Sequence, residues 1–303
     1  PELTERGYPP ERVIGSLGGA STLGLLIPPS IVMIVYGVAA EVSIAKLFVA
    51  GMIPGLMLAG LFSGYLMVWS LLNPDKIPEA DPGMSFTDKL RASSELIPVV
   101  LLIGGVIGSI YVGVATATEA AAIGVVGSLM LSAYQKSLNW QNFKDALLGA
   151  TRLYCMMALI LAGAAFLTLS MGYIGLPRHL AEWVGSLGLS PGLLLIALAL
   201  FFILLGCFLD GISMIVLTMG VLIPTVQAAG IDLIWFGIFV VIVVEMAQIT
   251  PPVGFNLFVL QGMTKREINW IASVCMPYFF LMVLAVCLLW WFPQIVMWLP
   301  GRM

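Results

Sequence analysis

Two Pro-Pro pairs stand within apolar stretches of the sequence. One lies in TLGLLIPPSIVMIVYG and the other in AQITPPVGFNLFVLQG. A break in a membrane-embedded helix exposes carbonyl and amide groups that lipid cannot satisfy, so broken helices face protein or a wet cavity. In transporters, such carbonyls coordinate cations, and the N-termini of half-helices face anionic groups of the substrate. For a single break a packing kink is the better explanation, whereas two matched breaks favour ion sites.

Residues beside both pairs offer the oxygen ligands that a hard cation such as sodium prefers. The predicted sodium ligands are Gly24, Ile27 and Pro28 at the first break and Ala247, Thr250 and Pro251 at the second. The residues predicted to bind substrate are Ser30 in the first copy and Gly254 and Asn256 in the second. No Arg or Lys lies within a break, so the sequence does not identify the substrate.

Three carboxylates, Glu119, Asp210 and Glu245, lie in apolar stretches, where a charge is costly and usually functional. Asp210, together with Ser213, is predicted to approach the break at Thr250 and to complete a sodium shell. Glu119 either lies within the membrane or caps the first turn of a helix near the end of a span. Glu245 is either a buried, hydrogen-bonded residue or a proton carrier.

The composition predicts that several helices cross a lipid bilayer. Apolar residues make up 60% of the chain and charged residues 10%, whereas about a quarter of residues are charged in soluble domains. A net charge of −3 without a basic stripe gives no footprint for nucleic acid. The four cysteines lack CxxC spacing and the single histidine has no ligand neighbours, so we expect packing and interfacial roles rather than metal sites.

The Pro and Gly residues reveal an internal repeat. A shift of 223 positions without a gap pairs Pro1 with Pro224, Gly7 with Gly230, Pro28 and Pro29 with Pro251 and Pro252, and Pro54 with Pro277. Because Pro and Gly dictate backbone shape, repeating them repeats a fold. We expect residues 1–72 to be the C-terminal part of a first repeat, 73–93 a cytoplasmic linker and 94–303 the second repeat. The N-terminal part of the first repeat would then precede Pro1.

Spans are predicted at 13–38 (broken), 47–72, 94–113, 117–135, 153–173, 237–261 (broken) and 270–292, with an interfacial helix at 138–148. The stretch 190–228 is predicted to be a re-entrant hairpin with Asp210 and Gly211 near its tip; two ordinary helices joined by a surface turn are the alternative. In both cases an odd number of crossings separates the broken helices, so the repeat is inverted. Ten Lys and Arg residues fall on one side and three on the other, which places Pro1 and the loop 73–95 inside.

Four motifs in order, TLGLLIPPSIVMIVYG, YVGVATATEAAAIG, LGCFLDGIS and QITPPVGFNLFV, resemble the large membrane subunit of tripartite ATP-independent periplasmic (TRAP) transporters. The likeness covers essentially the whole chain, and the combination is specific although each motif alone is weak. Ala117 stands where the family has a proline, which leaves the turn geometry before Glu119 less defined.

The resemblance implies an all-α integral membrane protein with an inverted-repeat ion-transporter fold of the elevator type, located in the bacterial inner membrane. Hairpins and broken helices would form a mobile transport domain that binds sodium. A small membrane subunit and a soluble periplasmic binding protein are the implied partners, and an organic acid such as a dicarboxylate or sialic acid is the implied substrate. The family's first hairpin lies ahead of the segment that begins at Pro1, so the first sodium site would be incomplete in this chain.

Three other functions fit the sequence less well. A channel typically has rings of like groups around a pore rather than two inverted half-sites. An intramembrane enzyme would need HExxH, a Ser-His pairing or a second Asp motif, and the sequence has none of these. A proton-coupled carrier that uses Glu119, Asp210 or Glu245 is the nearest alternative to sodium coupling.

Overall fold

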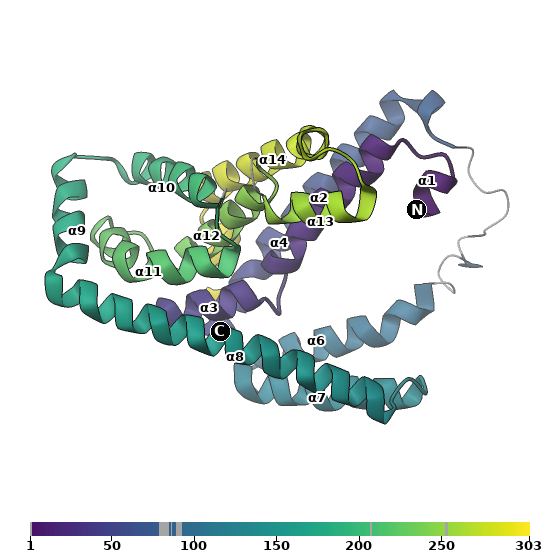
Figure 1. Ribbon diagram of the computed structural model, residues 1–303, viewed down its shortest axis with the longest axis horizontal. Coiled ribbons are helices and arrows are strands. Elements are labelled where there is room, and N and C mark those ends of the chain that lie inside the picture. Colours follow the sequence, from purple (N-terminus) through teal and green to yellow (C-terminus); the bar gives the residue numbers. More distant parts are fainter. Residues whose placement is uncertain (1, 79–84, 86, 89–92, 207, 252–253) are drawn as a thin grey trace. The chain divides into compact units, whose positions relative to one another are not determined.

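The computed structural model describes residues 2–78, 85, 87–88, 93–206, 208–251 and 254–303, and within them every regular element is a helix (Figure 1). The long helices are α2 (Pro10–Leu26), α3 (Ile31–Ala39), α4 (Ile44–Leu72), α6 (Ile97–Tyr111), α7 (Ala117–Tyr134), α8 (Trp140–Ile174), α9 (Leu176–Ser186), α10 (Pro191–Gly206), α11 (Gly211–Ala228), α12 (Leu233–Gln248), α13 (Phe255–Thr264) and α14 (Ile268–Trp291). Short helical turns occur at α1 (Glu2–Glu5), α15 (Gln294–Met297), Pro74–Lys76, Ser93–Leu96 and Pro300–Arg302.

Several of these helices are long and apolar enough to cross a membrane. By length and composition, α4, α7, α8, α11 and α14 qualify on their own. The pair α2 and α3 qualifies as one span that bends by 43° at its break. The predictions of an all-α protein and of many membrane spans are therefore confirmed.

The chain divides into two compact units, Pro1–Pro78 with Ala164–Arg302 and Glu79–Gly163 with Met303. The first unit has α12 at its centre, where every residue from Trp235 to Gln248 is buried. This helix packs against α2, α3, α4, α10, α11 and α14 (Figure 1). A helix that is apolar all round belongs inside a bundle. In the second unit, α6 packs against α7.

The helix bounds recur at the spacing of the sequence repeat. Moving α2 forward by 223 residues gives 233–249, and α12 spans Leu233–Gln248. The same shift carries α3 to 254–262, beside the observed Phe255–Thr264, and α4 to 267–295, beside Ile268–Trp291. Pro54 and Pro277 both lie inside the third helix of their copy. The inverted orientation of the copies and the domain division at 73–93 and 94–303 stay predictions.

One expected element is wrong. A separate interfacial helix at 138–148 followed by a span from 153 was predicted, whereas α8 runs without a break from Trp140 to Ile174. The four residues between the two predicted helices include no proline, and Thr151 returns a hydrogen bond to the carbonyl of Leu147 over 2.8 Å. Nothing there stops the helix from propagating.

Part of the predicted linker, with residues 79–84, 86 and 89–92, lies outside the described residues, as do Cys207 and Pro252. The hairpin stretch is present as α10 and α11 with a short connection between them. The choice between a re-entrant hairpin and two ordinary helices stays open.

Candidate functional site

The first break is closed by the hydroxyl of Ser30. The helix α2 ends at Leu26, and Ile27 continues in extended conformation. The Ser30 oxygen donates to the carbonyl of Leu25 and accepts from the amide of Met33 over 3.3 Å, which caps the start of α3. Ser and other short polar residues favour this position because they satisfy an unpaired helix N–H group. The predicted substrate ligand Ser30 is thus buried and serves the backbone in this conformation.

The second break begins where Thr250 bonds back to α12. Its hydroxyl donates to the carbonyls of Met246, over 2.6 Å, and of Ala247, over 3.2 Å. The chain then folds back so closely that a Cβ on Gly254 would lie 2.4 Å from the carbonyl oxygen of Gln248. The break therefore gathers the last carbonyls of α12 around one hydroxyl, which is a cluster of oxygen atoms that a cation can use.

The predicted hairpin tip is organised by Asp210, which caps α11. Its carboxylate accepts from the amides of Ile212, over 3.1 Å, and Ser213, over 3.3 Å, and also from the Ser213 hydroxyl. An aspartate at this position also complements the positive end of the helix dipole. Asp210 remains exposed, so its carboxylate keeps one side open.

Gly211 is the point where three elements meet. A Cβ on this residue would lie 2.7 Å from Val244 and 2.9 Å from the side-chain nitrogen of Gln248, both near the end of α12. Val32, in the first turn of α3, is 4.0 Å from the same point. The hairpin tip therefore packs against the last turns of α12, and the start of α3 lies near the same point. The approach of Asp210 and Ser213 to Thr250 stays a prediction.

Two of the three ligands predicted at the first break are exposed. A Cβ on Gly24 would have no neighbour within 4 Å, and Ile27 is 39% exposed. Pro28 is buried. At the second break, by contrast, Ala247 packs against Gly206 at the end of α10. The ion-binding role of both sets stays a prediction.

The remaining carboxylates differ from each other. Glu119 forms a capping box with Thr116: its carboxylate accepts from the Thr116 amide and hydroxyl, each over 2.8 Å, and the Thr116 hydroxyl accepts from the Glu119 amide. The capping alternative is therefore the correct one for Glu119. Glu245 is 1% exposed, and neither of its oxygens has a hydrogen-bond partner in the described part of the chain.

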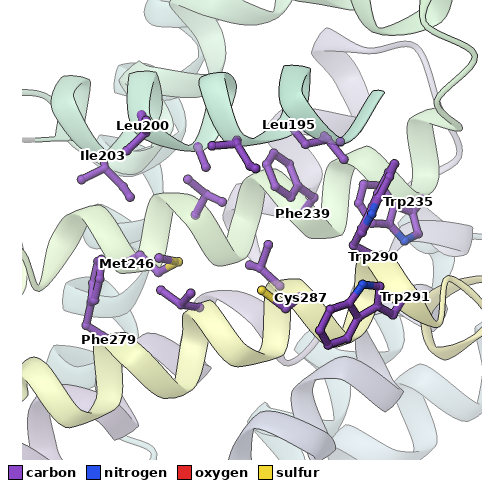
Figure 2. A pocket seen from close by; sticks show the side chains of 16 residues that line it. Leu195, Leu200, Ile203, Trp235, Phe239, Met246, Phe279, Cys287, Trp290 and Trp291 are labelled. Atoms are coloured by element: carbon purple, nitrogen blue, oxygen red, sulfur yellow. The ribbon is translucent and has the colours of Figure 1, made fainter. Parts of the chain in front are cut away.

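An apolar cavity of about 450 Å³ lies between α10, α12 and α14 (Figure 2). Leu195, Phe239, Cys287 and Trp290 are among the residues that line it, and Trp235 turns its indole N–H to the carbonyl of Leu289 over 3.3 Å. The predicted sodium and substrate residues do not line it. A carboxylate needs donors or positive charge, so this cavity is unsuited to an organic acid.

Sequence reasoning missed Gln248 and Ser21. Gln248 is 5% exposed and contacts the hairpin tip. Ser21, on α2, accepts a hydrogen bond from the side-chain amide of Asn256 on α13 over 3.1 Å. The position of Gln248 next to the break is the one feature of the sequence that indicates a role at the site. No local feature of the sequence indicates such a role for Ser21.

Comparison with known proteins identifies the family of the chain. A family model for the DctM component of the tripartite ATP-independent periplasmic transporter matches residues 1–295. The chain is 31% identical, over 300 residues, to the C4-dicarboxylate TRAP transporter large permease protein DctM of Pseudomonas aeruginosa, covering 99% of this chain and 70% of that protein. It is 33% identical, over 310 residues, to the ectoine/5-hydroxyectoine TRAP transporter large permease protein UehC of Ruegeria pomeroyi, covering 99% and 69%.

A third relative is the isethionate TRAP transporter permease protein DctMQ of Oleidesulfovibrio alaskensis, which is 28% identical over 305 residues and is covered to 47% of its length. The family match spans nearly the whole chain, and a relative above 30% identity is covered over more than two thirds of its length. This multi-pass membrane protein therefore belongs to the family of DctM components, the large permeases of TRAP transporters.

Proposed function

We propose that this permease is a sodium-coupled secondary transporter that imports an organic acid by an elevator movement of its broken helices and hairpin. The observation that carries the proposal is the meeting of three elements at Gly211. There the capped hairpin tip with Asp210 lies against the end of α12, next to the break at Thr250. A carboxylate, hydroxyls and the carbonyls of an interrupted helix are the groups with which transporters bind sodium.

The proposed substrate residues are Ser30, Gly254 and Asn256, at the starts of α3 and α13. Helix N-termini favour anionic groups because their first N–H groups are unpaired and the dipole is positive there. The relatives are named for a C4-dicarboxylate and for isethionate, and one for ectoine. These names support an organic acid as the class of substrate.

The proposed partners are a small membrane subunit and a periplasmic binding protein that delivers the substrate. The family description, a tripartite periplasmic transporter, supports both partners and a location in the bacterial inner membrane. The two inverted repeats, with the cytoplasmic linker at 73–93, are the proposed frame for the movement.

Uptake by the full-length transporter, reconstituted in liposomes with both partners, tests the proposal. Initial uptake of a panel of organic acids is measured with an inward sodium gradient, with a pH gradient, and with neither. We expect uptake to require sodium and the binding protein. Uptake that ignores sodium and follows the pH gradient would select the proton-coupled alternative instead.

A further inference from the structure

Glu245 is a carboxylate without a partner at the centre of the first unit. Its side chain is 1% exposed, and both of its oxygens lack a hydrogen-bond partner within the described residues. An ionised carboxylate removed from water is strongly unfavourable unless it is paired or hydrogen-bonded. The position therefore calls either for a positive charge beside the carboxylate or for a proton on it.

Described basic side chains do not supply that charge. The basic residues on helices packed against α12 are Arg12 on α2 and Lys46 on α4. Arg12 bonds the Tyr65 hydroxyl, and its guanidinium lies 4.5 Å from the centre of the Trp69 ring. Lys46 lies in the first turn of α4 and is exposed. Glu245 is therefore either balanced by a bound cation or neutralised by a proton.

Gln248 adds a second oxygen-bearing side chain one turn along the same helix. Residues three apart on a helix are neighbours on one face, with Cβ atoms about 5–6 Å apart. The Gln248 side chain is 5% exposed, and its nitrogen lies 2.9 Å from the point where a Cβ on Gly211 would stand. Gln248 therefore lies beside the hairpin tip, and Glu245 directly follows Val244, which meets the same glycine.

The opposite side of α12 is apolar. Val243 and Met246 line the cavity shown in Figure 2, and neither Glu245 nor Gln248 takes part in that lining. The two polar side chains are thus separated from the apolar cavity, and Gln248 lies on the face that meets the hairpin.

We propose that Glu245 and Gln248 supply side-chain oxygens to a sodium ion held between the end of α12 and the hairpin tip. The described residues hold no group of three or more Asp, Glu, His or Cys side chains, which a multivalent metal would favour. This inference rests on the proposed sodium coupling and adds two ligands that lie on the last turn of α12, ahead of the break.

The test compares three variants of the full transporter with its partners in liposomes. Initial uptake is measured against sodium concentration at constant pH, with choline keeping the ionic strength fixed. Glu245→Gln keeps the shape and removes the charge, and it is expected to raise the half-saturating sodium concentration by roughly tenfold or more. Gln248→Leu removes a neutral ligand and is expected to raise it by roughly threefold.

Thr225→Val is the matched control. The Thr225 hydroxyl is also buried without a hydrogen-bond partner in the described residues, but it lies 14 positions along α11 from Gly211. At a rise of about 1.5 Å per residue this separation is large. The control is expected to keep the sodium dependence of the wild type.

A second readout does not depend on transport. Sodium that binds the folded state raises the unfolding temperature of the purified protein relative to choline. This increase is expected in the wild type and in Thr225→Val, and it should shrink in Glu245→Gln. A reduced shift in a variant that still folds separates ion binding from a general loss of structure.

The outcomes are distinct. Wild-type uptake that does not need sodium overturns the proposed function together with this inference. Sodium-dependent uptake that is the same in Glu245→Gln overturns this inference alone. In a third outcome, Glu245→Gln changes the pH dependence of uptake and leaves its sodium dependence intact. This result would assign a proton to Glu245 and would also overturn the inference.

Discussion

The side-chain amide of Asn256 donates a hydrogen bond to the hydroxyl of Ser21 over 3.1 Å. Ser21 belongs to α2 and Asn256 to α13, so the bond joins the N-terminal half of one broken span to the C-terminal half of the other. The two residues are 235 positions apart. Asn256 is a predicted substrate residue, and Ser21 therefore holds it in position.

Replacing either partner of this bond should weaken the apparent affinity for substrate. Ser21→Ala and Asn256→Ala are expected to be non-additive, with a coupling of about 0.5–1 kcal/mol, because both remove the same partly exposed hydrogen bond. Uptake against substrate concentration in the two single variants and the double variant measures this coupling. Ser273→Ala, which removes a bond within α14, serves as control. Fully additive effects of the first two changes would show that the bond does not position Asn256.

The repeat could be predicted from sequence because its markers act locally. Pro54 and Pro277 constrain their own backbone wherever they stand, so matched prolines predict matched helices. The interruption at Asp210 and Gly211 could be predicted for a similar reason, since an Asp-Gly step within an apolar run is a typical turn. The structure places α11 directly after it.

Gln248 and Ser21 could not be predicted as site residues because their importance comes from contacts between distant segments. Hydrophobic periodicity tells which face of a helix is buried and is silent on which helix covers that face. Gln248 meets Gly211 only because the hairpin crosses the end of α12. The continuity of α8 is not evident in the sequence for the opposite reason: the charged residues near Lys144 favour a separate interfacial helix, although no proline follows to end it.

Gly211→Ala should push the hairpin tip away from α12. The new Cβ would lie 2.7 Å from Val244 and 2.9 Å from Gln248, which is closer than packed atoms allow. We expect a loss of about 1–3 kcal/mol in the free energy of unfolding, typical of overpacking. Thermal unfolding in detergent measures it.

Gly262→Ala is the control for that change, since a Cβ there would have no neighbour within 4 Å and the residue lies within α13. Alanine in a helix interior is expected to stabilise by up to about 1 kcal/mol. If Gly211→Ala proved as stable as Gly262→Ala, the close approach of the hairpin to α12 would be wrong.

Asp210 combines two roles that a pair of variants can separate. Asparagine caps helices about as well as aspartate, so Asp210→Asn should unfold like the wild type while its half-saturating sodium concentration rises. Asp210→Ala loses the bonds to the amides of Ile212 and Ser213 and should also lose about 1 kcal/mol of stability. Unfolding curves and sodium-dependent uptake are measured on both. If uptake by Asp210→Asn kept the sodium dependence of the wild type, Asp210 would only cap α11 and would not bind sodium.

Thr250 tests the second break itself. Its hydroxyl gathers the carbonyls of Met246 and Ala247, so Thr250→Val, which keeps the shape of the side chain, should disorganise the oxygen cluster. We expect sodium-driven uptake to fall by roughly tenfold or more, the change that about 1.4 kcal/mol produces. Thr250→Ser retains the hydroxyl and should keep most of the uptake. Uptake that survives in Thr250→Val and falls in Thr250→Ser would trace the effect to packing of the methyl group, and the hydroxyl would then have no part in holding the cation.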